Sequence, residues 1–402
     1  MKKICSFLKK IFNKVKNLFR KQRKIAQVYL YQYYRIYGNH TLKAVYDLLD
    51  TLYEVGFTGV YLIALWDDGG FDNGFDVISY RTNRKFTDAE GESDTLAVIE
   101  KAHSLGMIIG ADVVPNHVSD KNVLAQRCLK GVKGYKDALY VVTPEMAAEL
   151  KEKGVPSFFG SEPYSEVEGF EGKGKYVRNS FCDGKQLNVN WNNAKVRKYF
   201  KGVFSRFKKL YHFDFARIDC GMMLLEDVSK AKPGLAGMVS CMNPRKSVEA
   251  VRSVAGNMLL FYEWFGPSTP EFSPDIFNED KNSFALDCSY VFNSKQSTSW
   301  DHPKLVPLIG GHDQQPFYNA ADEQEFTPSK VLENMKKSPC KYVFSDIQSE
   351  MGYKIPDAEL AFTDEDKNYD ADPNNLNKRF LGRRPPYCVT GLIDTEPGDS
   401  VD

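Results

Sequence analysis

The sequence predicts an α/β fold, a (β/α)8 TIM barrel of eight parallel strands with an inserted subdomain after the third strand. The chain has 402 residues, which exceeds the ~250 residues of a typical barrel of this kind and favours one large domain with an insertion. Short apolar, β-prone runs alternate with helical stretches, as expected of repeated βα units around a parallel sheet. Four of the predicted strands also end in charged residues, at the edge where such barrels carry their active sites.

The individual elements follow from the spacing of the apolar residues and from the length of each run. Strands are predicted at residues 26–33, 59–65, 107–113, 214–218, 258–262, 284–290, 305–309 and 342–344. Helices are predicted at residues 41–55, 94–105 and 194–211.

The βα alternation stops between residues 118 and 185, where the sequence is rich in Gly, Lys and Glu. Such a stretch is too long for an ordinary connection, so we expect an inserted subdomain. No C-terminal β-sandwich is evident, because the sequence after residue 357 is polar and contains prolines. We therefore divide the chain into a basic amphipathic helix at 1–24, a first barrel part at 25–117, an inserted subdomain at 118–186, and a second barrel part with a C-terminal tail at 187–402.

The segment 1–24 contains ten Lys or Arg residues and no Asp or Glu, and its apolar residues recur at helical spacing. It lacks the ~20 apolar residues that span a bilayer and the ~7–15 that form the core of a signal peptide. We expect an amphipathic helix on an anionic, cytoplasm-facing membrane surface. A basic tail without fixed structure and a helix that docks on a partner protein are the alternatives.

The rest of the chain carries 43 basic and 53 acidic residues, a net charge of −10. Such a body repels phosphates, so binding of nucleic acid through general electrostatics is not expected. The eight cysteines form no CxxC pair and there are only six histidines, which argues against a zinc site. We expect free thiols in a reducing compartment and a cytoplasmic protein, peripheral on the inner face of the membrane.

Polar residues follow four predicted strands. The segments are Asp112-Val-Val-Pro-Asn116-His117, Phe215-Ala-Arg217-Ile-Asp219, Phe261-Tyr-Glu263-Trp264 and Gly310-Gly311-His312-Asp313. A single carboxylate after a strand is usually a helix cap or a surface group. A cluster at several strand ends is different, because burying it opposes folding unless function retains it.

These segments resemble the four signature regions of the α-amylase family of glycoside hydrolases, family thirteen, in order, spacing and local sequence. The resemblance covers residues 26–344 and extends to Gly74-Phe75-Asp76-Val77 and to residues 186–191. It implies that Asp219 is the nucleophile, Glu263 the general acid/base and Asp313 the transition-state stabiliser. The implied substrate-binding residues are Phe75, Asp76, His117, Arg217, Trp264 and His312.

The chemistry has a physical basis apart from the resemblance. Retaining cleavage of a glycosidic bond needs two carboxyls ~5–5.5 Å apart, one ionised and one protonated. Arg217 lies two residues before Asp219 on one strand, so both point to the same side and the arginine can hold the carboxylate charged. The apolar neighbours of Glu263 (Tyr262, Trp264 and Phe265) would favour its protonated form.

Some positions depart from the family pattern. Phe75 stands where a tyrosine is usual, and Met222-Met223 replace a Lys-His pair that binds starch chains in amylases. Asn116 matches a calcium ligand of true amylases, but the histidine that usually assists is missing. We therefore expect no cofactor and leave calcium open.

The sequence thus predicts a retaining α-glycoside hydrolase or transglycosylase that acts on an α-linked glucoside or oligosaccharide near a membrane surface. The alternative is a non-catalytic, amylase-like scaffold at the membrane. Such relatives typically lose a catalytic carboxylate, whereas this chain has all three. A barrel enzyme of phosphate chemistry is not supported, since no Gly-rich GxxxxGK[ST] loop is present.

Overall fold

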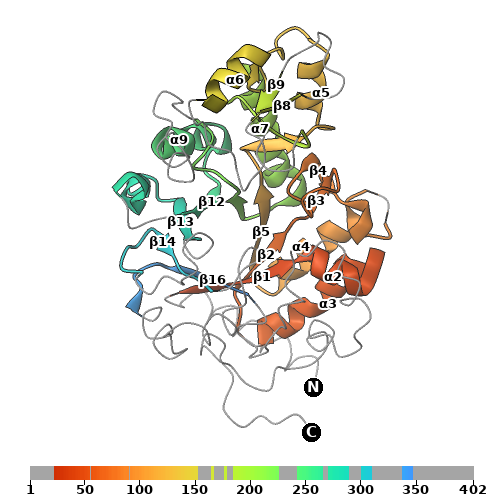
Figure 1. Ribbon diagram of the computed structural model, residues 1–402. Helices are drawn as coiled ribbons and strands as arrows, with labels where there is room; N and C mark the ends of the chain where they lie inside the picture. The colour runs from red at the N-terminus through yellow and green to blue at the C-terminus, as the bar shows by residue number, and fades with distance from the viewer. Residues whose placement is uncertain are drawn as a thin grey trace, which may run out of the picture.

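The computed structural model describes residues 22–54, 56–89, 91–152, 164–166, 176–178, 184–225, 242–265, 270–288, 300–309 and 337–346. Parallel strands at the centre of the molecule form one sheet in the order β14-β13-β12-β11-β5-β2-β1-β16-β15 (Figure 1). The strands are β1 (Arg23–Tyr29), β2 (Gly59–Ile63), β5 (Ile108–Val113), β11 (Phe215–Ile218), β12 (Leu259–Trp264), β13 (Ser283–Asp287), β14 (Leu305–Val306), β15 (Leu308–Ile309) and β16 (Tyr342–Asp346).

The sheet curls into a nearly closed barrel of eight parallel strands. The short strands β14 and β15 form a single barrel strand that Pro307 interrupts, because proline has no N–H for the ladder. One part pairs with β13 and the other with β16, which joins the two ends of the sheet. The Pro307 carbonyl still accepts a hydrogen bond of 3.0 Å from Phe344 N. The predicted barrel is confirmed.

Helices follow the strands and lie outside the barrel (Figure 1). Packing joins α2 to α3, α3 to α4, and α7 to α9. Each helix buries one apolar stripe, as in α3, where Leu42, Val45 and Leu49 are buried. The helices and helical turns of the barrel are α2 (Leu30–Tyr37), η1 (Gly38–His40), α3 (Thr41–Glu54), η2 (Arg84–Phe86), α4 (Ser93–Ser104), α7 (Ala194–Arg206), its π-helical continuation η3 (Phe207–Tyr211), α9 (Pro244–Ala255), η5 (Pro270–Phe272) and η6 (Pro274–Phe277).

Two predicted boundaries at the start of the chain are wrong. The first strand was expected at 26–33, but β1 ends at Tyr29 and α2 begins at Leu30. Tyr31 and Tyr33 lie on that helix and are buried. The boundary was misplaced because a short run rich in aromatic residues is compatible with a buried strand and with a buried helix. The basic helix expected at 1–24 cannot reach its predicted end, because Arg23 and Lys24 pair with β16. Residues 1–21 lie outside the described residues.

Aromatic rings fill the barrel interior. Phe261 packs against Phe344 and Tyr342 with ring centroids 4.8 and 4.9 Å apart, and Phe215 packs against Phe261 at 5.3 Å. Gly110 on β5 makes room for this cluster, because an added Cβ would lie 2.4 Å from the backbone oxygen of Phe215.

Two excursions leave the barrel near the carboxyl ends of its strands. After β2, the hairpin of β3 (Trp66–Asp68) and β4 (Val77–Thr82) carries the predicted Phe75 and Asp76. After β5, the chain forms a group of small elements at the top of Figure 1. These are β6 (His117–Ser119), α5 (Val123–Leu129), β7 (Val141–Val142), α6 (Pro144–Glu152), β8 (Tyr164–Glu166), β9 (Tyr176–Arg178) and β10 (Gln186–Asn188).

Antiparallel pairing organises this second excursion. Strand β6 pairs with β10, so that His117 lies opposite Asn188, and β7, β9 and β8 form a three-stranded sheet. Within the described part of the chain, no helix is long and apolar enough to cross a membrane.

Candidate active site

The carboxyl ends of three neighbouring strands bring four charged side chains together. Asp112 is the last but one residue of β5, Arg217 lies on β11, Asp219 directly follows that strand, and Glu263 lies on β12. The parallel register places Arg217 opposite Asp112 on one side and opposite Phe261 on the other. Residues far apart in sequence are therefore neighbours at one mouth of the barrel, as predicted for this end.

Arg217 is the centre of this group. Its side chain is only 2% exposed. Its Nη1 lies 3.3 Å from Asp112 Oδ1 and also donates to Asp219 Oδ1, while Nη2 lies 2.5 Å from Glu263 Oε1. One guanidinium thus bridges the two predicted catalytic carboxylates. This confirms that Arg217 and Asp219 project to the same side of β11.

The electrostatics of the group depend on that arginine. Burial alone would lower the pKa of Arg217, but the surrounding acidic groups, Glu263 first, raise it well above its ordinary value. The guanidinium therefore stays charged. A permanent buried cation offsets the mutual repulsion of the three carboxylates that it contacts.

Asp112 was part of a predicted motif but received no role in the sequence analysis. The Tyr61 hydroxyl and Arg217 Nη1 both donate to its Oδ1, and Ala64 N donates to its Oδ2 at 3.1 Å. Burial raises the pKa of Asp112 to about 6, although Arg217 and the Tyr61 hydrogen bond lower it. Its contacts make it a positioning residue for the guanidinium. The sequence signal was its place at the end of a buried strand, but its partners come from other strands.

The Glu263 carboxyl has polar partners, whereas the sequence predicted apolar neighbours around it. Cys220 N donates to Oε2 at 2.7 Å, and Arg217 binds the other oxygen. The neighbours Tyr262 and Trp264 point away from the carboxyl, because alternate residues of a strand face opposite sides. The apolar environment predicted for Glu263 from its sequence neighbours is therefore wrong for Tyr262 and Trp264. Cys220, whose N–H donates to Glu263, adopts a φ of 45°, in the left-handed region that few non-glycine residues occupy.

Trp264 does not lie where the prediction placed it. The side chain is fully buried, its Nε1 donates to the Phe272 carbonyl at 2.6 Å, and its ring packs 4.9 Å from that of Phe277. The strand alternation that brings Glu263 inward turns Trp264 outward, into the packing between the barrel and the η5 and η6 turns. Its assignment as a substrate-binding residue is therefore corrected to a packing role.

Of three other predicted binding residues, Phe75 and His117 lie at the same mouth, and Asp76 directly follows Phe75 in the chain. The Arg217 Cζ atom is 5.8 Å from the ring centroid of Phe75. Asp76 is buried and accepts hydrogen bonds of 3.2 Å from Phe71 N and from Asp72 N. Burial first, and then the charge of Asp68, raises the pKa of Asp76 to about 6.

His117 is the third of these residues. It is buried, and burial lowers the pKa of its imidazole below the ordinary value, although the charge of Asp219 opposes this effect. The ring is therefore neutral near pH 7. A neutral imidazole beside the carboxylate group can donate a hydrogen bond to a sugar hydroxyl.

His312 and Asp313 lie outside the described residues, and so do the segments 226–241, 266–269 and 289–299 that follow β11, β12 and β13. The roles predicted for these two residues stay predictions.

The described residues near the mouth do not fit a metal ion. His117, Asp219 and Cys220 place possible ligand atoms within 4.8 Å of one another, the one such group among the described residues. Burial raises the pKa of the Cys220 thiol well above its ordinary value, and Asp219 is paired with Arg217. A protonated thiol and an occupied carboxylate both oppose metal binding.

Asn116, the candidate calcium ligand, offers little more. Its carbonyl oxygen accepts hydrogen bonds of 3.0 Å from Val189 N and 3.2 Å from Asn188 Nδ2. Calcium takes ~6–8 oxygen ligands, of which Asn116 would supply one. The expectation that no cofactor is needed stays a prediction.

Fold and site together define a barrel protein with an acidic site at the carboxyl ends of its parallel strands. Comparison with known families is more specific, because residues 27–254 match the alpha-amylase catalytic domain. The match covers more than half of the chain, and the chain belongs to the alpha-amylase family.

Individual relatives agree with this assignment. The chain is 29% identical over 182 residues to an oligo-1,6-glucosidase of Heyndrickxia coagulans, a match that covers 44% of this chain and 31% of the relative. It is 29% identical over 183 residues to maltase A1 of Drosophila melanogaster, covering 42% of this chain and 31% of the relative. The matched region therefore spans about a third of the length of these curated relatives.

Solved structures share the fold. An alpha-glucosyl transfer enzyme superposes with a TM-score of 0.67 at 16% identity, covering 94% of this chain and 77% of the other. Trehalose-6-phosphate hydrolase of Bacillus licheniformis superposes with a TM-score of 0.66 at 14% identity, covering 90% and 73%.

Proposed function

We propose that the chain is a retaining α-glycoside hydrolase or transglycosylase that acts on an α-linked glucoside or oligosaccharide. The observation that carries this proposal is the Arg217 guanidinium, which binds Asp219 and Glu263 together at the ends of two neighbouring strands. Retaining cleavage needs two carboxyls ~5–5.5 Å apart, and two groups that share one guanidinium stay within reach of the same glycosidic bond. The relatives named as glucosidases support the same reaction class.

In this proposal Asp219 attacks the anomeric carbon and forms a covalent glycosyl-enzyme, while Glu263 protonates the departing oxygen. Glu263 then removes a proton from the acceptor, which is water in hydrolysis or a sugar hydroxyl in transfer. Arg217 stabilises the negative charge of Asp219 before attack. Asp313 stabilises the oxocarbenium-like transition state, and Phe75, Asp76, His117 and His312 hold the reacting sugar.

A trapping experiment tests the covalent step. A 5-fluoro-α-glucosyl fluoride reacts with a retaining α-glucosidase but releases slowly, so intact-mass measurement should show one added glycosyl group. Peptide mapping should place it on Asp219. Asp219→Asn should form no adduct and lower turnover of an aryl α-glucoside by roughly 10⁴-fold or more.

Asp214→Asn is the matched control. Asp214 is an exposed carboxylate directly before β11, at the end of the strand opposite to Asp219. The control should keep wild-type turnover. Turnover that is the same in Asp219→Asn and in the wild type would refute the assignment, and no adduct or turnover with any α-glycoside would favour the non-catalytic scaffold. Supplying sugar acceptors to the trapped enzyme then separates transfer from hydrolysis.

We propose further that residues 1–21, which precede the barrel, bring this enzyme to an anionic membrane surface. The support is their sequence, with eight basic residues, no acidic residue and apolar residues at helical spacing. The full chain should sediment with vesicles that contain phosphatidylglycerol and not with neutral phosphatidylcholine vesicles. Replacing Lys9, Lys10 and Lys14 by Gln should weaken that binding, and equal sedimentation with both lipids would contradict the proposal.

A further inference from the structure

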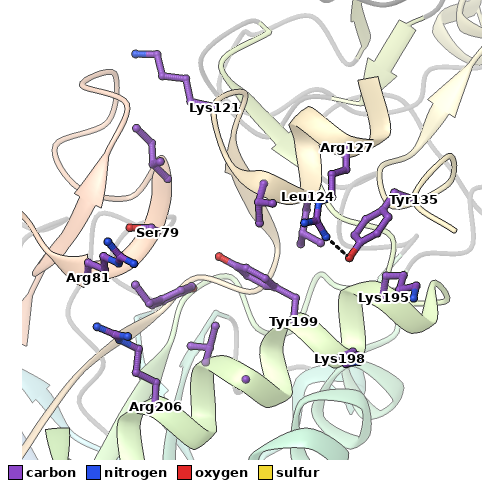
Figure 2. A pocket seen from close by; sticks show the side chains of 15 residues that line it. Ser79, Arg81, Lys121, Leu124, Arg127, Tyr135, Lys195, Lys198, Tyr199 and Arg206 are labelled. Atoms are coloured by element: carbon purple, nitrogen blue, oxygen red, sulfur yellow. Dashed lines mark hydrogen bonds between the residues drawn. The ribbon is translucent and has the colours of Figure 1, made fainter. Parts of the chain in front are cut away.

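A basic groove lies on the flank of the barrel, built from three parts of the chain. It has a volume of about 700 Å³ and lies between strand β4, the α5 region of the second excursion, and helix α7. Figure 2 shows Arg81 and Arg206 on one side of it, Arg127, Tyr135 and Lys195 on the other, and Tyr199 between them. None of the residues at the carboxylate cluster lines it.

Six cations and no carboxylate line this groove. The cations are Arg81, Lys121, Arg127, Lys195, Lys198 and Arg206. Within the described part of the chain, Arg206 is the one among them that forms an ion pair, at 2.8 Å from Glu92. Arg127 instead donates to the Tyr135 hydroxyl at 2.7 Å. The repulsion among these cations is therefore largely uncompensated by the protein itself.

Helix α7 forms the floor and holds the groove open. Lys195, Lys198, Gly202 and Arg206 recur at spacings of three and four residues, which places them on one face of the helix. A Cβ added at Gly202 would meet no atom within 4 Å, so no close packing requires the glycine there. A glycine inside a helix is destabilising relative to alanine, and here it leaves the groove hollow.

The walls are fixed relative to one another. Asn122 caps α5 by accepting from Leu124 N at 2.9 Å, and its Nδ2 donates to Ile78 O at 2.8 Å and to the Tyr199 hydroxyl at 3.1 Å. One buried side chain thus ties β4, α5 and α7 together. The cations are presented by a rigid frame and not by separate flexible loops.

We infer that this groove binds a small molecule with at least two phosphate groups, at a site separate from the carboxylate cluster. Phosphate oxygens accept hydrogen bonds from arginine and lysine, and two such groups match cations that face each other across the groove. The volume suits a ligand of the size of a sugar or nucleotide.

The overall charge argues for a small ligand over a long polyanion. Outside residues 1–24 the chain carries a net charge of −10, which repels an extended polyanion. A ligand that fits the groove experiences mainly the charges within the screening length of ~8–10 Å, and these are positive.

Calorimetric titration of the full chain with inorganic pyrophosphate and with glucose 1,6-bisphosphate tests the inference. Both should bind, neutral maltose should not bind at the groove, and added salt should weaken binding. Arg81→Gln/Lys198→Gln removes one cation from β4 and one from the α7 floor and should weaken binding about tenfold or more. Arg245→Gln/Lys246→Gln, two exposed residues on α9, makes the same change in net charge and should leave affinity unchanged.

Gly202→Leu gives a second, fold-preserving test. Its Cβ meets no atom within 4 Å, its longer side chain should fill the groove, and leucine is a better helix former than glycine, so the melting temperature should stay the same or rise while binding is lost. The inference is refuted if neither phosphate compound binds, or if the groove variants bind as tightly as the α9 control. It is also refuted if Gly202→Leu retains wild-type affinity. Tighter binding of the bisphosphorylated sugar than of pyrophosphate would show that the sugar ring also contacts the groove.

Discussion

Replacing Arg217 by Met removes the one cation that three buried carboxylates share. The Met side chain has a similar length and is apolar, so the change is mainly one of charge and hydrogen bonding. Removing one partner of a buried ion pair typically costs ~3–5 kcal/mol, because the other charge is left uncompensated. Since Arg217 contacts Asp112, Asp219 and Glu263, we expect a loss of about 4 kcal/mol or more near neutral pH.

The pH dependence of this loss is the diagnostic result. Arg217 lowers the pKa of Asp112, which is nevertheless about 6 in the folded protein. Without the arginine that pKa rises further. A carboxyl whose folded pKa exceeds its unfolded value is destabilising once pH rises past both values, and this penalty disappears below the unfolded pKa. The variant should therefore lose most stability at high pH and recover a large part of it in acid.

Urea unfolding, followed by tryptophan fluorescence at about pH 7.5 and about pH 4.5, measures both values. Arg197→Met is the control, because Arg197 donates to the carbonyls of Trp191 at 2.7 Å and Asn192 at 2.8 Å. Its effect should be the same at both pH values. An equal loss for Arg217→Met at both pH values would refute the view that Arg217 stabilises the fold by neutralising buried carboxylates.

Three further predictions follow from individual contacts. The rise in the pKa of Asp112 from 3.8 to about 6 corresponds to a loss of roughly 3 kcal/mol in the free energy of unfolding as pH rises between these values. Asp112→Asn should remove this pH-dependent loss, and an unchanged dependence of stability on pH would contradict the prediction. Trp264→Phe should lower the free energy of unfolding by about 2–3 kcal/mol, because the hydrogen bond to Phe272 and part of the packing are lost. The KM for an aryl α-glucoside should not change. A several-fold rise in KM would show that Trp264 binds substrate after all. Gly110→Ala should lower the free energy of unfolding by more than ~3 kcal/mol, because its Cβ would lie 2.4 Å from the Phe215 oxygen. A wild-type melting temperature would show that the neighbouring strands can move apart to accommodate the methyl group.

Strand positions were predictable because parallel strands in a barrel are buried on both faces and read as continuous apolar runs. The run at Gly59–Ile63 is buried throughout and was found from sequence. The run after Ala26 was misread at its end, because Leu30 and the following tyrosines are equally compatible with strand and helix. Local pattern alone does not decide between these states; contacts with the rest of the fold do.

Side-chain direction was predictable within one strand and unpredictable between strands. The two-residue period of a strand correctly placed Arg217 and Asp219 on the same side. The same period turns Trp264 away from Glu263, so these neighbours in sequence face opposite sides of β12. The groove on α7 was not predicted either, since its cations come from three segments spread over more than a hundred residues of the chain.

The sequence by itself determined the barrel, the order of its strands and the ends at which charged groups gather, because these follow from apolar periodicity and from the shared direction of parallel strands. Only the tertiary structure decided which groups touch. The bonds from Tyr61 to Asp112, from Cys220 N to Glu263 and from Arg217 to Asp112 and Glu263 join residues of different strands or of the turns that follow them. Such contacts depend on the register between strands and on burial, neither of which a local pattern of residues encodes.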